Sequence, residues 1–184
     1  NTDFGSVRYQ AIKLSCMKLF LELSYSLCNY SGRLGMIVPS GIYTDNGTKA
    51  LRDLFLDQCK WEWLFGFENK NGIFAIHRSY KFCPLVLTKG GVTTVIQTAF
   101  MQHDLTSWES PWVHSIKYSA EQIKIFSPDS RALLEIRSNR DLTILNKIYS
   151  NSVLLGDQGP NGWGITYSAE FHMTNDSHLF PPVD

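Results

Sequence analysis

Apolar residues recur with different spacings along the first third of the chain. Over residues 8–30 they return every three or four positions, which predicts a long helix, and Gly32 is placed to end it. The many apolar positions in this segment predict a helix that is buried on more than one side. Leu34–Val38 is a short continuous apolar run, typical of a strand inside a parallel sheet. Helical spacing returns over Thr48–Gln58.

The following segment favours strands. Trp61–Phe67 is rich in aromatic residues, and Phe82–Leu87 is almost wholly apolar. Lys89-Gly90-Gly91 has the composition of a hairpin turn, and Val92–Phe100 alternates well enough to pair with Phe82–Leu87 across it. The first hundred residues therefore predict an α/β fold: part of an open, mostly parallel sheet that ends in a β-hairpin.

The chain changes character after residue 102. A short helix is predicted over Asn139–Tyr149, and Asn151–Asp184 is rich in Gly, Asn, Ser and Thr. We place a domain boundary here, between residues 1–102 and a mixed α+β segment over residues 103–184. The polar ending favours a piece of a longer protein.

Composition is that of a soluble globular protein, with 43% hydrophobic and 18% charged residues. No apolar run is long enough to span a membrane, and the first residues lack the apolar core of a signal peptide. The 4 cysteines form no Cys-x-x-Cys pair, so no metal site is predicted. These features favour a reducing cytoplasm.

Charge is distributed unevenly on a chain whose net charge is zero. No acidic residue lies between Glu68 and Asp104. The basic and histidine residues of this interval are Lys70, His77, Arg78, Lys81, Lys89 and His103. Such a segment is either a surface that faces phosphates or the solvated basic edge of a strand pair.

Two stretches resemble a known family: GRLGMIVPSGIYTDNGTKALRDLF (32–55) and WEWLFGFENKNGIFAIHRSYKFCPLVLTKGG (61–91). They are similar to the second half of the catalytic domain of adenine-specific DNA methyltransferases. The likeness is greatest to the large enzymes of type IIG restriction–modification and phage-exclusion (BREX-like) systems. The elements that match in order are Leu34–Pro39, Leu51-Arg52, Trp61–Phe67 and Ile73-Phe74. Residues 170–180 are similar to the entry of the target-recognition region in the same enzymes.

This resemblance implies an enzyme that transfers a methyl group from S-adenosylmethionine to a flipped adenine in double-stranded DNA. The family polarises the amine with an Asn/Asp-Pro-Pro-Tyr/Phe motif and holds the cofactor on a glycine-containing first strand. Neither motif occurs in this sequence. We therefore expect no catalytic and no cofactor-binding residue in these 184 residues, and no methylation by this chain alone. Residues 1–102 would be the later part of the catalytic domain, and residues 103–184 the start of the target-recognition region.

The resemblance does assign residues to the base pocket. Phe74 occupies the place of an aromatic residue that stacks on the extruded base, although a core phenylalanine would fit the pattern as well. Pro39 and Ser40 would border the pocket, because ligands bind at the carboxyl edge of open α/β sheets; simple strand termination is the alternative. His77, Arg78 and Lys81 are candidates for phosphate contacts, or else they form a solvated edge.

Two other functions stay open. A non-catalytic DNA-binding or assembly module would bind DNA without the missing motifs. An unrelated α/β domain would neither bind DNA nor belong to a protein that carries those motifs. A half-sheet would also leave a free edge through which two copies could pair. The target sequence, the presence of a nuclease and the oligomeric state are not encoded in any feature that we identify. The compartment implied by the resemblance is the bacterial cytoplasm.

Overall fold

A computed structural model describes residues 16–166, 168, 170–172 and 176–180. The chain forms two compact units, residues 1–146 and 147–184, which are described separately. The first part of the chain contains α1 (Cys16–Leu27), β1 (Arg33–Pro39), α2 (Gly41–Thr44), η1 (Asn46–Thr48), α3 (Lys49–Gln58), β2 (Cys59–Glu68) and η2 (Asn69–Asn71). It continues with β3 (Lys81–Lys89), β4 (Val95–Gln102), α4 (Thr106–Glu109), α5 (Pro111–His114), β5 (Ile116–Ser119), α6 (Ala120–Phe126) and α7 (Asn139–Ser150). The start of the helix predicted over residues 8–30 lies outside the described residues.

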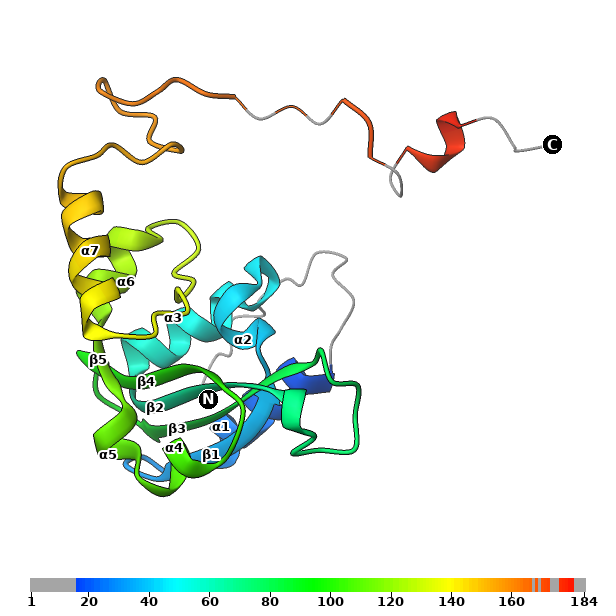
Figure 1. The fold of residues 1–184 in the computed structure, drawn as a ribbon, viewed down its shortest axis with the longest axis vertical. Coiled ribbons are helices and arrows are strands. Elements are labelled where there is room, and N and C mark those ends of the chain that lie inside the picture. Colours follow the sequence, from blue (N-terminus) through cyan, green and yellow to red (C-terminus); the bar gives the residue numbers. More distant parts are fainter. Residues whose placement is uncertain (1–15, 167, 169, 173–175, 181–184) are drawn as a thin grey trace, which may run out of the picture. The chain divides into compact units, whose positions relative to one another are not determined.

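Five strands form one sheet in the order β1-β3-β2-β4-β5 (Figure 1). Strand β3 runs antiparallel to both β1 and β2, and β5 runs antiparallel to β4. The pair of β2 and β4 is parallel. The predicted α/β class is confirmed, but the sheet is mixed rather than mostly parallel.

The predicted hairpin between β3 and β4 is wrong, because β4 pairs with β2 and β5 instead. Thr93 gives the physical reason. It is buried, and its hydroxyl lies 2.9 Å and 2.8 Å from the carbonyl oxygens of Phe55 and Cys59. The same hydroxyl accepts a hydrogen bond from the N–H of Trp61. These contacts fasten the segment after β3 across the start of β2, so that the chain emerges on the far side of β2.

The sheet has two unlike faces, which are best seen on β3. The helix face carries Cys83, Leu85 and Leu87, all fully buried. Helix α3 packs on this face, where Phe55 meets Trp61 at a ring-centroid distance of 5.7 Å. The pocket face carries the alternate residues Phe82, Pro84 and Val86, because successive side chains of a strand point to opposite sides.

Strand β1 lies at the edge of the sheet and follows the same alternation. Its helix-face residues Met36 and Val38 are partly or fully buried, whereas Ile37 on the pocket face is 58% exposed. The predicted setting inside a parallel sheet is therefore wrong for this strand. Helix α1 also differs from expectation: over its described residues it buries Leu21 but leaves Phe20 and Leu23 exposed.

Arg52 of α3 organises the irregular backbone above the helix face. Its side chain is fully buried, and it donates hydrogen bonds to the carbonyl oxygens of Ile42 and Asp45 and to the hydroxyl of Thr48. It also donates to the carbonyl oxygen of Ser130 at 2.8 Å and 3.2 Å. Burial lowers the pKa of this guanidinium. The Leu-Arg pair noted in the sequence thus holds a turn and a distant segment together.

The sheet continues past residue 102, because β5 adds a strand beside β4. Helix α6 begins with a capping box between Ser119 and Gln122. The first compact unit runs on to residue 146, so its limit does not coincide with the boundary drawn at residue 102. That boundary rests on function and stays a prediction.

The second unit holds the end of α7, a long irregular stretch and the short η3 (Ser177–Leu179). This irregularity is in line with the Gly, Asn, Ser and Thr content of the stretch. Among the described residues, no helix combines the length and apolar character needed to cross a membrane.

Candidate base-binding site

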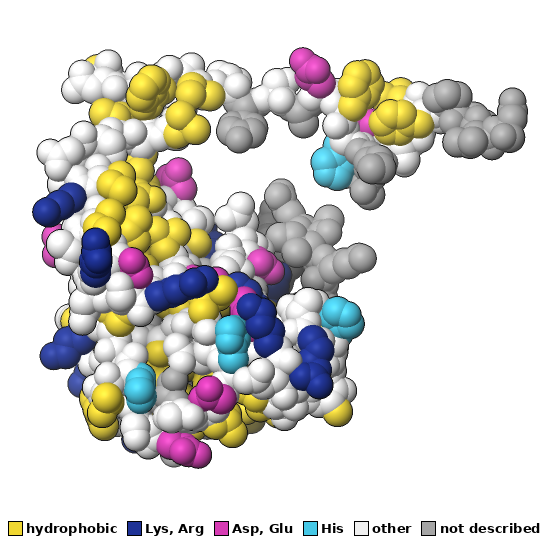
Figure 2. Space-filling model, in the orientation of Figure 1, with side chains coloured by type: hydrophobic (Ala, Val, Ile, Leu, Met, Phe, Trp, Pro, Cys, Tyr) yellow, Lys and Arg dark blue, Asp and Glu magenta, His cyan; other side chains and the backbone are white. Residues whose placement is uncertain are grey.

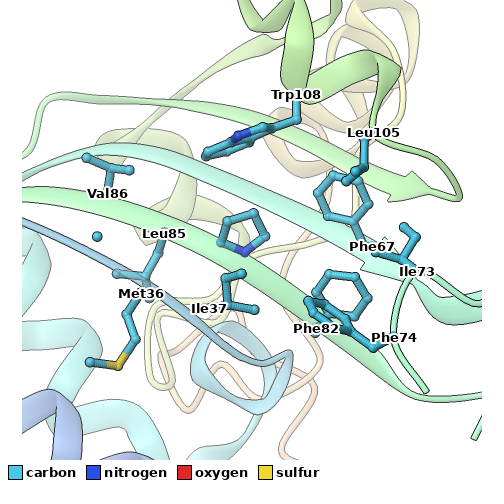
Figure 3. A pocket seen from close by; sticks show the side chains of 12 residues that line it. Met36, Ile37, Phe67, Ile73, Phe74, Phe82, Leu85, Val86, Leu105 and Trp108 are labelled. Atoms are coloured by element: carbon cyan, nitrogen blue, oxygen red, sulfur yellow. The ribbon is translucent and has the colours of Figure 1, made fainter. Parts of the chain in front are cut away.

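A hollow of about 280 Å³ lies on the pocket face of the sheet (Figure 3). Strands β1, β2 and β3 form its floor, and the loop after η2 and the region of α4 form its rim. Its lining residues are Gly35, Met36, Ile37, Phe67, Ile73, Phe74, Phe82, Pro84, Leu85, Val86, Leu105 and Trp108. All of these residues are apolar, and the volume is near the lower end of ligand pockets, roughly 300–1,000 Å³. The hollow suits a small flat apolar surface.

Phe74 stands at the rim of this hollow. Its ring meets that of Phe82 edge to face, with centroids 4.8 Å apart and an interplanar angle of 76°. Phe82 in turn stacks on Phe67 at 5.4 Å. Phe74 is 40% exposed, so one side of its ring is anchored while part of it faces solvent. This position differs from that of a core phenylalanine.

The loop that carries Phe74, residues 72–80, is held by Asn69 at its base. Asn69 is fully buried. Its side-chain oxygen accepts a hydrogen bond from the N–H of Phe74, and its side-chain nitrogen donates to the carbonyl oxygens of Phe74 and Ile76, all at 3.0 Å. The sequence analysis assigned no role to Asn69. The only available signal was an Asn directly after a strand and five residues before an aromatic residue.

Pro39 and Ser40 lie next to the hollow without lining it. Pro39 is exposed at the end of β1 and is paired in register with Phe82, which contacts Phe74. Ser40 donates its backbone N–H to the carbonyl oxygen of Lys81. The structure therefore brings Pro39 and Phe74 to the same aromatic side chain, while Ser40 contacts the neighbouring backbone.

Lys81 points to the helix face, where it takes part in a charged cluster. Its ammonium donates to the carboxylate of Glu135 at 2.8 Å and 3.1 Å and lies 3.6 Å from Glu68. Glu135 also accepts a hydrogen bond from the hydroxyl of Tyr43 at 2.8 Å. The hydrogen bonds to Glu135 raise the pKa of Lys81. Burial raises the pKa of Tyr43, which keeps its hydroxyl a donor.

Glu68 completes this cluster at the end of β2. Its carboxylate lies 2.5 Å from the ammonium of Lys70 and 2.9 Å from Nε2 of His103. The hydrogen bonds from Lys70 and His103 lower the pKa of Glu68 to about 2. The positive charges of Lys70 and Lys81 are therefore both balanced by carboxylates that lie close in space.

His77 and Arg78 lie in the exposed loop between β2 and β3. Nδ1 of His77 lies 2.7 Å from the hydroxyl of Ser79, and Arg78 donates to the carbonyl oxygen of Lys70 at 2.6 Å. Among the described residues, no carboxylate lies within ion-pair distance of either side chain. Figure 2 shows basic and histidine side chains gathered over this part of the molecule.

Lys89 ends the acid-free segment in a structural role. Its ammonium donates to the carbonyl oxygens of Tyr25 and Cys28, at the carboxyl end of α1, and lies 4.5 Å above the ring of Tyr25. A cation at this position satisfies carbonyl groups that the helix leaves unpaired. Of the basic residues in the segment, Arg78 and His77 are thus the ones best placed to meet an anion.

Comparison with known proteins gives this geometry a context. Residues 3–74, less than half of the chain, match the sequence profile of the Eco57I restriction-modification methylase family. The match ends at Phe74, at the rim of the hollow. No curated protein sequence matches the chain.

Two solved structures share the fold. The M protein of the type I restriction enzyme EcoKI superimposes with a TM-score of 0.54 at 15% sequence identity, over 74% of this chain and 42% of that chain. A modification subunit attributed to a type I restriction enzyme of Vibrio vulnificus gives a TM-score of 0.50 at 18% identity, over 69% of this chain and 33% of that chain. The arrangement of the sheet and its helices is therefore similar to the fold of these two proteins. This chain spans less than half the length of either structure.

Proposed function

We propose that this chain is part of a DNA methyltransferase of a restriction–modification system and that it forms the wall of a pocket for a flipped adenine. The observation that carries this proposal is the placement of Phe74. An aromatic ring, anchored on one side and open on the other, stands beside an apolar hollow. Stacking on such a ring contributes roughly 1–3 kcal/mol per base.

The apolar lining of the hollow supports binding of a base, but not recognition of which base it is. Among its lining side chains, the indole N–H of Trp108 is the only group able to donate a hydrogen bond. A base placed there would gain contact area but few directional bonds. Recognition of the amine that distinguishes adenine would then come from residues outside this hollow, in keeping with the missing Asn-Pro-Pro motif.

S-adenosylmethionine is the methyl donor that this proposal implies. The described residues do not fit it: the hollow offers no carboxylate for a ribose hydroxyl, and the sequence before Leu34 has no glycine-rich turn between a strand and a helix. We therefore assign no donor-binding residue to this chain. Its own contribution is to orient the base through Phe74 and to present His77 and Arg78 to the phosphates of double-stranded DNA.

The finer assignment, an enzyme of a type IIG or phage-exclusion system, remains our proposal from the sequence resemblance. The alternative of an assembly or DNA-binding module without catalysis would use the same loop. The two are separated by methyl transfer in the native protein that contains these residues.

The experiment is a single-turnover methylation assay on duplex DNA with labelled donor, comparing the native protein with Phe74→Ala. We expect the rate to fall about 5- to 150-fold, which corresponds to the loss of one stacked base. Affinity for duplex DNA should change little, because phosphate contacts dominate it.

Tyr80→Ala is the matched control, since Tyr80 is an exposed aromatic residue of the same loop that does not line the hollow. Phe74→Trp should restore most of the rate. An unchanged rate in Phe74→Ala would contradict the stacking role. Absence of methyl transfer in the native protein, with DNA binding intact, would favour the assembly module.

A further inference from the structure

We propose that Asn69 is the positioning residue of this site: its buried amide holds Phe74 in the orientation in which the ring stacks on a base. This inference rests on the proposed function. The side chain of Asn69 cannot touch the base, yet its replacement would measurably change how the base is held.

The side-chain amide of Asn69 hydrogen-bonds to both backbone polar groups of Phe74. The oxygen accepts from the N–H of Phe74, and the nitrogen donates to the carbonyl oxygen of the same residue. The same nitrogen also donates a hydrogen bond to the carbonyl oxygen of Ile76, with 3.0 Å between the nitrogen and the oxygen. These partners fix which way the amide points, because only its oxygen can accept and only its nitrogen can donate.

With both polar groups of Phe74 bound, the backbone on which the ring is mounted has little freedom. The ring itself is limited by its edge-to-face contact with Phe82. Ordering a free residue costs backbone conformational entropy. Asn69 removes that cost before a base arrives, which is how positioning groups favour a productive geometry.

Loop closure at the base does not depend on this side chain. The backbone N–H of Asn69 donates to the carbonyl oxygen of Tyr80, and its carbonyl oxygen accepts from Gly72, which adopts a left-handed conformation with φ of 71°. Replacing the Asn69 side chain should therefore release the tip of the loop around Phe74 while β2 and β3 stay joined.

The test is a double-mutant cycle in the native protein that contains this chain, with Asn69→Ala, Phe74→Ala and the combined variant. We measure single-turnover methylation and the fluorescence of 2-aminopurine placed at the target adenine. If Asn69 acts through Phe74, each single variant lowers the rate, and the combined variant is within about twofold of Phe74→Ala alone, because the two sites are coupled. The 2-aminopurine signal should change in the same way in all three.

Asn69→Ser serves as the milder variant in case Asn69→Ala fails to fold. Its hydroxyl can replace one hydrogen bond of the amide but not all three. Hydrogen–deuterium exchange over residues 69–80 provides a readout independent of catalysis: exchange should rise at Phe74 and stay unchanged in β2 and β3.

The outcomes separate the two levels of the argument. A wild-type rate in Asn69→Ala or Asn69→Ser, together with a low rate in Phe74→Ala, would overturn the positioning role and leave the proposed function intact. Additive losses in the combined variant would likewise overturn it, since Asn69 would then act independently of Phe74. A wild-type rate in Phe74→Ala would overturn the proposed function itself.

Discussion

The two faces of the sheet are made by the same strands, but the pocket face leaves some of its apolar residues open to solvent. On the helix face, Leu85 is fully buried, and the charged groups of Arg52 and Lys81 find partners in the surrounding backbone and carboxylates. On the pocket face, Phe67 and Phe82 are buried as well, but Ile37 and Phe74 remain 58% and 40% exposed. The comparison teaches that the exposed residues of the pocket face can be altered with less effect on stability than the buried residues of either face.

The largest effect should come from the core of the helix face. Leu87→Ala should lower the free energy of unfolding by about 2–5 kcal/mol, because this fully buried side chain leaves a cavity on the helix face. Ile37→Ala is the matched truncation on the pocket face and should cost less than about 1 kcal/mol, because the side chain is mostly in water already. Chemical denaturation measures both. Equal losses would mean that the side chain of Ile37 contributes to the core as much as that of Leu87.

Two arginines extend the comparison to polar groups. Arg52→Lys should cost about 2–4 kcal/mol, since an ammonium cannot reach the set of carbonyl oxygens that the guanidinium fork spans. Arg33 lies on the pocket face, and its exposed side chain pairs with Glu62. Arg33→Lys should change stability by less than about 0.5 kcal/mol. Thermal unfolding of the two variants checks this, and a small effect for Arg52→Lys would contradict its organising role.

Acid should weaken the cluster around Glu68. The folded pKa of Glu68, about 2, lies below its ordinary value of 4.5. The stability that this carboxylate contributes is therefore complete above about pH 5 and is lost as the pH falls toward 2, by an amount on the order of 2 kcal/mol. In Glu68→Gln, the free energy of unfolding should fall less as the pH is lowered from about 5 toward 2. Denaturation at a series of pH values measures this. An unchanged acid limb in that variant would assign the loss to other groups.

Local patterns predicted most elements of the first hundred residues. Strands β2 and β3 and helix α3 lie where aromatic content and helical spacing place them. Their pairing was not predictable, because the Lys-Gly-Gly turn is compatible with a hairpin until the buried Thr93 is seen to fasten the next segment elsewhere. The burial of α1 was overestimated, because the spacing of its apolar residues does not reveal which of them other elements cover.

The candidate site shows a similar limit. Phe74 was chosen through a family resemblance, and the structure places it at the rim of an apolar hollow; its stacking role stays a prediction. Lys81 was chosen because its neighbours in sequence carry no negative charge, yet Glu135 pairs with it from 54 positions away. Linear charge patterns cannot contain such a contact. Asn69 was overlooked for the same reason, since its role depends on how the loop turns back.

Gly35 has a consequence for how this site could change. It lines the floor of the hollow, and a methyl group added there would meet nothing closer than Val86, at 4.0 Å. The fold therefore places no steric demand on this position. Larger side chains at residue 35 would reduce the volume of the hollow while the strand kept its register. A single substitution at this position would therefore change the size of the group that the hollow accepts, without altering the fold.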